Sequence, residues 1–284
     1  MPDRSLTRYG LRAVALAYLA AILVLPVSMV LVNAFGDGIG PVLDALRDPA
    51  FLHALQLTVT AVVIAVPLNT VFGVVCALSL VRRGSDRGSW FFNSAIGLPL
   101  ALSPVVVGLS LVLVYGRDGW LGSWLVANGI QVVFSTPGIV LATVFVTLPF
   151  VVREVVPVLR EIGSDQEEVS WTLGAGPAQT FRRITLPAIR WGVAYGVVLT
   201  TARALGEYGA VAVVSGRLAG KTETLTIHVD EQYLRFNEVA AYTTSLVLAL
   251  LAVLTLVALS VLQPRHEKEV SDVDRRQPGV EALR

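Results

Sequence analysis

Residues 165–187, DQEEVSWTLGAGPAQTFRRITLP, form a polar segment between two long apolar runs, 136–152 and 192–214. Glycine and proline interrupt the segment in its middle, and proline closes it. Helices in a bundle are usually joined by about 2–8 residues, so this connection is longer than the joining of two helices requires. Its length and composition raise the question of what it contacts.

Two short helices are predicted within this segment. Ser164, followed three residues later by Glu167, matches a capping box, in which both side chains bind free N–H groups at a helix start. Gly174 fits the left-handed position that often ends a helix, and Pro177 fits the first position of the next one. We expect that second helix to end at the Leu-Pro pair that closes the segment.

The first of these helices carries an apolar face. Val169 and Leu173 are four residues apart and share one side of the helix, beside Trp171. Such a face needs a partner, which is the lipid headgroup layer, the rest of the bundle or another protein. By themselves these residues fit an interfacial helix without a special role and a docking element equally well.

The composition indicates a membrane protein. Of the 284 residues, 54% are hydrophobic and 15% are charged, whereas soluble domains carry about 25% charged residues. The net charge of +1 lacks the basic surplus typical of chains that bind nucleic acid. The single cysteine, Cys76, and three scattered histidines offer neither a disulfide nor the HExxH spacing of a metal site.

Six apolar runs predict an all-α membrane protein with six transmembrane helices, because a bilayer core requires about 20 apolar residues in a helix. The runs are 14–32, 55–81, 91–115, 136–152, 192–214 and 239–262. Prolines interrupt several of them, such as Pro67 in the second and Pro99 and Pro104 in the third. Proline kinks a helix, and kinked helices suit a bundle that encloses a pathway as well as ordinary packing.

Positive charge sets the expected orientation. The segments rich in lysine and arginine are 4–12, 82–87, 153–190 and 263–284. Of the three loops that alternate with these segments, the first two carry one basic residue each, and the last carries three, Arg217, Lys221 and Arg235, as many as 4–12 or 82–87. Since basic loops stay in the cytoplasm, we expect both termini and residues 165–187 on the cytoplasmic side. We divide the chain into 1–54 with the first helix and an outer loop, a transmembrane core at 55–262, and a disordered tail at 263–284.

The polar segment resembles the EAA loop of binding-protein-dependent ABC importer permeases. That pattern consists of Glu-Ala-Ala, three residues, Gly, nine residues, Ile, one residue and Leu-Pro. The residues that match it here are Glu168, Gly174, Ile184, Leu186 and Pro187. Val169 and Ser170 replace the two alanines, which puts a close backbone approach there in doubt.

The resemblance implies a type I ABC importer permease fold, in which this loop forms cytoplasmic coupling helices that dock on an ATPase. Glu168 is then the expected polar contact with the ATPase and Gly174 the turn between the helices. Leu186 and Pro187 are expected to begin the next membrane element.

A second resemblance lies in residues 200–229, TTARALGEYGAVAVVSGRLAGKTETLTIHV, which are similar to sulfate and thiosulfate permeases of the CysW type. Those permeases have an Ala-Arg-Ala-x-Gly-Glu-(Phe/Tyr)-Gly-Ala run before a Ser-Gly…Gly-x-Thr-x-Thr-Leu loop. The likeness extends from residue 55 to residue 262. The matching residues are Arg203, Gly206, Glu207, Tyr208, Gly209, Ala210, Ser215, Gly216, Gly220, Thr222, Thr224 and Leu225.

Arg203 and Glu207 fall in the fifth predicted span, where ionisable groups are costly and therefore candidates for function. At a spacing of i, i+4 on a helix the two charges neutralise each other. Two interpretations stay open. The pair only packs between helices, or Arg203 offers an oxyanion a favourable path while Glu207 prevents tight binding.

Residues 215–222, SGRLAGKT, nearly match the phosphate-binding loop GxxxxGKT. We reject a nucleotide site because Ser215 stands where the first glycine is required and the segment follows a membrane helix on the expected outer side. We expect Ser215, Gly216, Lys221 and Thr222 to belong to an outer gate or to a surface that meets a substrate-binding protein. The alternative is an ordinary solvated loop.

These observations predict a permease subunit of an ATP-driven sulfate or thiosulfate importer in the bacterial inner membrane. The resemblance implies an ATPase dimer, a second homologous permease and an extracytoplasmic sulfate-binding protein as partners. ATP and Mg²⁺ are expected on the ATPase, with no cofactor and no catalysis on this chain. A molybdate or tungstate importer is the first alternative. A secondary transporter and a membrane-embedded enzyme are disfavoured, since neither inverted repeats nor convergent acid, base or metal groups are seen.

Overall fold

The protein is built from helices throughout the part that the computed structural model describes, residues 4–82 and 87–276, which contains no strand. Arg83, one of the basic residues used to orient the chain, and residues 277–284 of the predicted tail lie outside the described residues.

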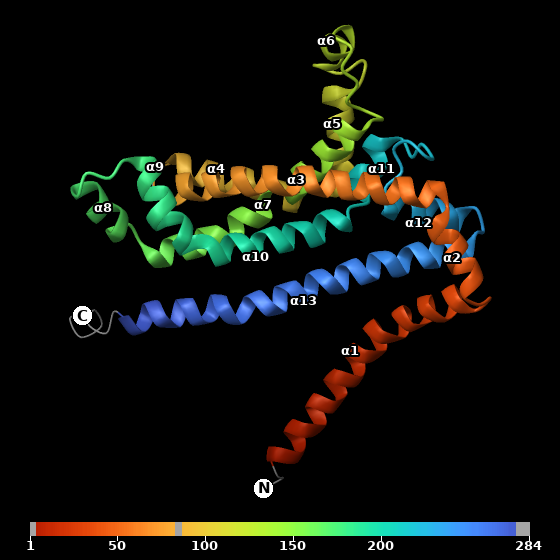
Figure 1. The fold of residues 1–284 in the computed structure, drawn as a ribbon, viewed down its shortest axis with the longest axis horizontal. Coiled ribbons are helices and arrows are strands. Elements are labelled where there is room, and N and C mark those ends of the chain that lie inside the picture. The colour runs from red at the N-terminus through yellow and green to blue at the C-terminus, as the bar shows by residue number, and fades with distance from the viewer. Residues whose placement is uncertain (1–3, 83–86, 277–284) are drawn as a thin grey trace.

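Four long helices form the bundle: α3 (Pro49–Arg82), α7 (Thr136–Ile162), α10 (Leu186–Leu205) and α13 (Glu238–Arg276). α3 packs most extensively against α7, α7 packs against α10, and α10 packs against α13, as Figure 1 shows. Apolar side chains on every side of these helices allow several neighbours at once. The order of packing places α7 and α10 between α3 and α13.

The first helix, α1 (Arg4–Phe35), diverges from the bundle and contacts it through α13 and through α2 (Ile39–Arg47). Its most apolar window has a mean hydropathy of 2.5 and is 0% buried. In a bilayer this surface faces lipid or another protein.

Among the described residues, five helices are long and apolar enough to cross a membrane, or six if one bent pair counts as a single span, and with that pair the predicted number of six is confirmed. The third span is not the kinked helix that its prolines suggested. α4 (Arg87–Ala101) and α5 (Pro104–Tyr115) meet at 110°. Ser103 is extended (φ −62°, ψ 135°) because the residue before a proline is driven out of the helical region.

The fifth span also differs from the prediction of one helix over 192–214. α10 ends at Leu205, and a separate short helix, α11 (Gly209–Ser215), begins after Gly206 has capped it. Apolar periodicity does not reveal this break, because both helices are equally apolar.

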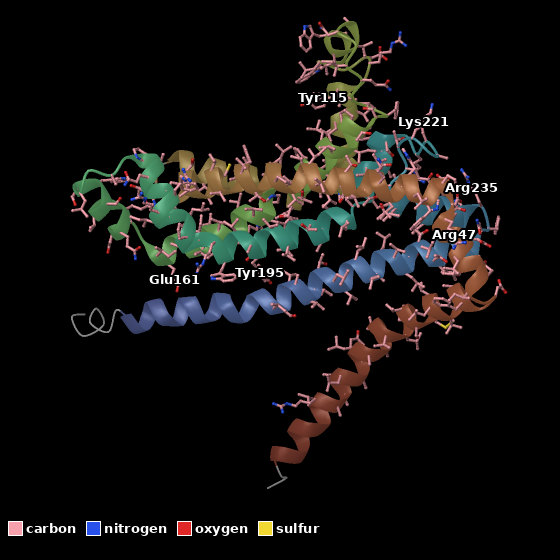
Figure 2. All side chains as sticks on the ribbon, in the orientation of Figure 1. Arg47, Tyr115, Glu161, Tyr195, Lys221 and Arg235 are labelled. Atoms are coloured by element: carbon pink, nitrogen blue, oxygen red, sulfur yellow. The ribbon has the colours of Figure 1, made fainter. Side chains whose placement is uncertain are left out.

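The two ends of the bundle carry different elements. α8 (Asp165–Thr172), α9 (Pro177–Thr180) and the C-terminal end of α13 lie at one end, and α2, α11 and α12 (Leu225–Leu234) lie at the other. Figure 2 places Glu161 at the first end and Lys221 and Arg235 at the opposite one. α5 leaves the side of the bundle as an arm that carries α6 (Gly122–Ala127) at its tip (Figure 1).

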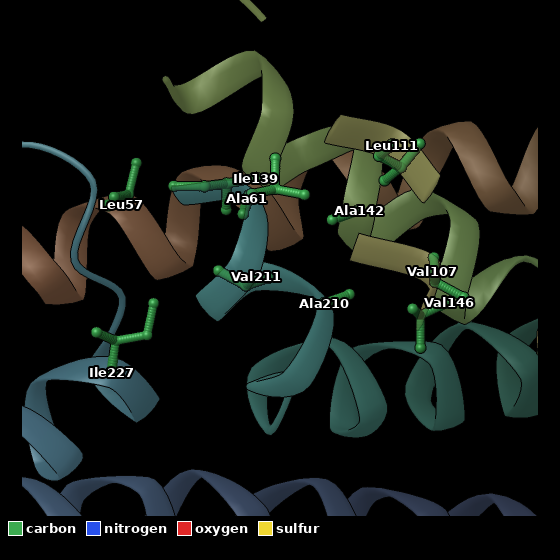
Figure 3. Close-up of a cluster of buried hydrophobic side chains, with 11 residues drawn as sticks. Leu57, Ala61, Val107, Leu111, Ile139, Ala142, Val146, Ala210, Val211 and Ile227 are labelled. Carbon is green, nitrogen blue, oxygen red and sulfur yellow. The ribbon is translucent and has the colours of Figure 1, made fainter. Parts of the chain in front are cut away.

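Three apolar cores hold the described part of the bundle together. The first joins α3, α5, α7, α11 and α12 through side chains such as Val107, Ile139 and Val211 (Figure 3). The second joins α3, α4, α7 and α10 nearer the α8–α9 end. The third, around Phe51, Ala54 and Leu225, joins α2, α3, α12 and α13. α5 and α11 approach closely at Gly108, where a Cβ atom would lie 2.7 Å from a backbone oxygen of α11.

α13 extends as a helix to Arg276. The disordered tail at 263–284 stays a prediction.

Candidate functional site

Helix α8 ends in a Schellman turn. Its C-cap is Leu173, and Gly174 follows in the left-handed conformation with φ 84°. The N–H of Ala175 donates to the carbonyl of Ser170, and the N–H of Gly174 donates to that of Trp171, both at 3.0 Å. This is the helix end predicted for Gly174, because glycine adopts a positive φ without strain.

Helix α9 begins at Pro177 after an extended Gly176, as predicted. Its predicted end is wrong. α9 continues through a π-helical turn, Phe181–Thr185, which contains Ile184, directly into α10. Leu186 and Pro187 therefore begin α10, as the family resemblance implied.

A missing hydrogen-bond donor accounts for the π-helical turn. Pro187 has no N–H for the carbonyl four residues before it, so the regular helical ladder is interrupted there. The N–H of Leu186 donates to the carbonyl of Phe181, one residue further back than in an α-helix. The chain thus enters the membrane helix without a break between α9 and α10.

The predicted apolar face of α8 is uncovered. Val169 is 58% exposed, Trp171 53% and Leu173 83%. Exposed apolar patches at one end of a protein mark a contact with lipid or with another protein. Beside them Glu168 is exposed, and its Oε1 accepts a hydrogen bond of 2.7 Å from the hydroxyl of Ser164.

The predicted capping box is wrong. Ser164 precedes α8 but makes no side-chain bond to a backbone N–H, since its hydroxyl is used by Glu168. Glu167 turns inward instead of returning to the helix start. Its carboxylate accepts a hydrogen bond of 2.9 Å from Nη2 of Arg82 at the end of α3 and one of 2.7 Å from the Thr185 hydroxyl. Nε of Arg82 lies 2.8 Å from the other carboxylate oxygen, which completes the ion pair.

Ser170 joins the two short helices. Its side chain is buried, and its hydroxyl lies 2.8 Å from that of Thr180 in α9. The hydroxyl also donates to the carbonyl of Glu167 at 2.7 Å. Ser170, at the position of the second alanine of the family pattern, thus forms a hydrogen bond between α8 and α9. Val169, at the position of the first alanine, is exposed.

Arg203 and Glu207 form the predicted pair, with 2.6 Å between the guanidinium and the carboxylate. Glu207 lies beyond the end of α10, so the two do not share one helix. Its Oε1 accepts a bond from the N–H of Ala210 at the start of α11, and its carbonyl accepts one from Thr226 of α12. Only 1% of the Glu207 side chain is exposed, against 32% of Arg203, so the arginine is both neutralised and accessible.

The loop 215–222 is closed by its own hydrogen bonds. The hydroxyl of Thr222 donates to the carbonyl of Ser215 at 2.6 Å and accepts from the N–H of Leu218. Ser215 is the last residue of α11, and Gly216 follows with φ 68°. A phosphate cradle needs helix N–H groups pointing at the anion, whereas this helix end presents carbonyls. Lys221 is exposed on the loop.

A polar network of Arg217, which lies in this loop, with Tyr208 and Asp230 on its two sides was missed. The hydroxyl of Tyr208 donates to Asp230 at 2.7 Å, and Arg217 donates to both, at 2.8 Å each. Burial raises the pKa of Tyr208, and its bond to Asp230 raises it further, so the phenol stays protonated and donating. An arginine and acidic residues on the two sides of the loop were the only sequence signal for this network.

A buried pair at the start of α12 was also missed. His228 Nδ1 lies 2.8 Å from the carboxylate of Glu223, and its ring meets that of Phe51 edge-on, with centroids 6.2 Å apart. The N–H of Leu225 donates to Thr58, which fastens α12 to α3. Among the residues that the structure describes, no group of three or more His, Cys, Asp or Glu side chains could hold a metal ion.

Residues 69–270 match the family described as "Binding-protein-dependent transport system inner membrane component". The chain is 52% identical over 272 residues to the "Sulfate transport system permease protein CysW" of Synechocystis sp., covering 95% of this chain and 98% of that one. It is 48% identical over 250 residues to the protein of the same name from Escherichia coli K12, covering 88% and 86%.

Solved structures share the fold. A chain of a bacterial alginate ABC transporter, in complex with an alginate pentasaccharide-bound periplasmic protein, superimposes with a TM-score of 0.71 at 17% identity. The match covers 91% of this chain and 93% of that one. The fold is therefore the type I permease fold of ABC importers, in agreement with the helix arrangement described above.

Proposed function

This chain belongs to the family of binding-protein-dependent transport system inner membrane components, and on that basis we propose that it is the permease subunit of an ATP-driven importer that carries sulfate or thiosulfate. The observation that carries the coupling role is the uncovered apolar face of α8, which lies beside the exposed Glu168 at one end of the bundle. The choice of substrate rests on the names of the sulfate permeases to which the chain is similar.

The partners follow from this role. An ATPase dimer docks on α8 and α9 and binds the ATP and Mg²⁺, while this chain binds no cofactor and hydrolyses nothing. A second, homologous permease completes the pathway, and an extracytoplasmic sulfate-binding protein delivers the anion to the end of the bundle that carries α11, α12 and residues 215–222. Binding of ATP moves α8, and the broken helices convert that movement into alternating access.

The orientation is part of the proposal. Both termini and the α8–α9 end lie in the cytoplasm, in keeping with the basic residues of 153–190 and with the common position of α8, α9 and the end of α13. Residues 215–222 then lie on the outer side.

Arg203 contributes to the anion pathway in this proposal. Its guanidinium is one-third exposed beside a helix break, and Glu207 neutralises it, so that a passing dianion is attracted without being held. Arg203→Gln is therefore expected to lower the rate of sulfate uptake more than Arg203→Lys does. Equal rates in both variants and the native chain would show that the pair only packs.

Sulfate uptake in cells that lack this chain tests the whole proposal. The native chain is expected to restore uptake, whereas Glu168→Arg is expected to reach the membrane but neither to restore uptake nor to co-purify with the ATPase. Restoration of molybdate uptake alone would overturn the substrate, and normal transport by Glu168→Arg would overturn the docking role of α8.

A further inference from the structure

One buried carboxylate joins three elements that are far apart in the sequence. Glu167 of α8 binds Arg82, the last residue of α3, through two contacts: Nε to Oε2 at 2.8 Å and Nη2 to Oε1 at 2.9 Å. The hydroxyl of Thr185, in the π-helical turn before α10, donates to Oε1 at 2.7 Å. The cluster therefore connects α8 with the ends of two membrane helices.

The geometry of this cluster makes it stiff. Arg82 donates one charge-assisted hydrogen bond to the carboxylate, and its Nε lies 2.8 Å from the other carboxylate oxygen, so the ion pair contacts both oxygens. Only 9% of the Glu167 side chain and 23% of Arg82 are exposed, so water competes weakly for these bonds. The cavity beside them has a volume of about 10 Å³, which leaves room for about one water molecule.

The cluster lies between α8 and the ends of the helices α3 and α10. α8 packs on α9 and on the π-helical turn, and Glu167 adds a direct ion pair from α8 to α3. α3 and α10 both pack along α7, and α10 ends beside the Arg203–Glu207 pair. A displacement of α8 thus reaches both membrane helices through one side chain, while the neighbouring Glu168 stays exposed.

We propose that Glu167 is a positioning residue which, with Arg82 and Thr185, transmits movement of α8 into α3 and α10 during transport. This role rests on the proposed function, because it requires an ATPase that moves α8. The two adjacent glutamates have different roles. Glu168 faces the ATPase, and Glu167 holds α8 to α3 and α10, the helices that open and close the pathway. Coupling of this kind is carried by rigid elements and their hydrogen-bonded contacts.

The quantity that tests the proposal is the number of sulfate ions imported per ATP hydrolysed. It is measured in proteoliposomes that hold the complete complex of this chain, the second permease and the ATPase, with the sulfate-binding protein added. A purely structural role would change the amount of assembled complex but not this ratio. Glu161→Gln serves as the matched control, since Glu161 is an exposed glutamate at the same end of the bundle (Figure 2).

Glu167→Gln is expected to assemble and hydrolyse ATP while its import per ATP falls about tenfold, a typical size for the loss of one coupling contact. Arg82→Lys, which keeps the charge but loses the planar guanidinium that contacts both carboxylate oxygens, is expected to give an intermediate ratio, and Glu161→Gln the native one. If Glu167→Gln does not assemble, Arg82→Lys carries the test.

A native ratio in an assembled Glu167→Gln complex, or in Arg82→Lys, overturns the proposal. Absence of ATP-driven sulfate import by the unaltered complex overturns the proposed function instead, so the two failures are distinguishable.

Discussion

Replacing Leu173 by serine is expected to weaken the association of this chain with its ATPase without destabilising the chain. Leu173 lies at the end of α8 and is 83% exposed, so it contributes little to the packing of the isolated protein. If α8 docks on the ATPase, the apolar surface of this side chain is removed from water only in the complex. The substitution therefore separates docking from folding.

The size of the effect follows from this exposure. Burying a leucine side chain completely contributes about 1.5–3 kcal/mol. Since most of the Leu173 surface is still available to be buried, Leu173→Ser is expected to remove about 2 kcal/mol of binding free energy and to raise the Kd about 30-fold.

The assay is a titration of the purified ATPase against the detergent-solubilised chain, with thermal unfolding measured in parallel. Leu234→Ser is the matched control, because Leu234 is 61% exposed on α12 at the opposite end of the bundle. An unchanged Kd for Leu173→Ser, or an equal loss in the control, would refute the reasoning that α8 is the docking surface.

Three further substitutions test the packing through thermal unfolding of the purified chain. Gly108→Ala would place a Cβ 2.7 Å from a backbone oxygen of α11, and the free energy of unfolding is expected to fall by about 1–3 kcal/mol. The control is Gly97→Ala, where a Cβ would have no neighbour within 4 Å and no loss is expected. Equal effects of the two substitutions would contradict the close approach of α5 and α11. Gly174→Ala should lose about 1–2 kcal/mol because φ is positive there, and Gly174→Asn less; no loss with alanine would speak against the left-handed turn. Glu207→Gln leaves the charge of Arg203 without its partner and is expected to lower the free energy of unfolding by about 2 kcal/mol, less than for a fully buried pair. A native Tm would mean that the pair does not hold α10 to α11.

Membrane spans are predictable from this sequence because length and apolarity suffice to place a helix in a bilayer. The breaks within these spans are harder to predict from the sequence. At Ser103 two nearby prolines signalled a disturbance, but its 110° bend is set by the packing of α5 on α11. At Gly206 the chain breaks where the Glu207 carboxylate accepts a bond from the N–H of Ala210 at the start of α11, and the pattern of apolar residues does not predict this contact.

The adjacent glutamates of α8 show a similar limit. Their spacing from Ser164 suggested that Glu167 caps the helix, and local geometry alone offers no objection. What turns Glu167 inward is Arg82, which lies 85 residues earlier in the chain, together with Thr185. Whether Glu167 caps the helix or pairs with a distant arginine depends on the tertiary fold, so the spacing of neighbouring residues does not predict it. In contrast, the left-handed conformation of Gly174 was predictable, because the end of a helix often requires a positive φ and glycine adopts it without strain.

ATP-dependent uptake of radiolabelled sulfate by proteoliposomes tests the assigned function most directly. The vesicles contain this chain, the second permease and the ATPase, and the sulfate-binding protein is supplied outside. Sulfate is expected to accumulate only when ATP and Mg²⁺ are enclosed, and excess molybdate should not abolish the uptake. Accumulation without ATP, or of molybdate in place of sulfate, would contradict an ATP-driven sulfate permease.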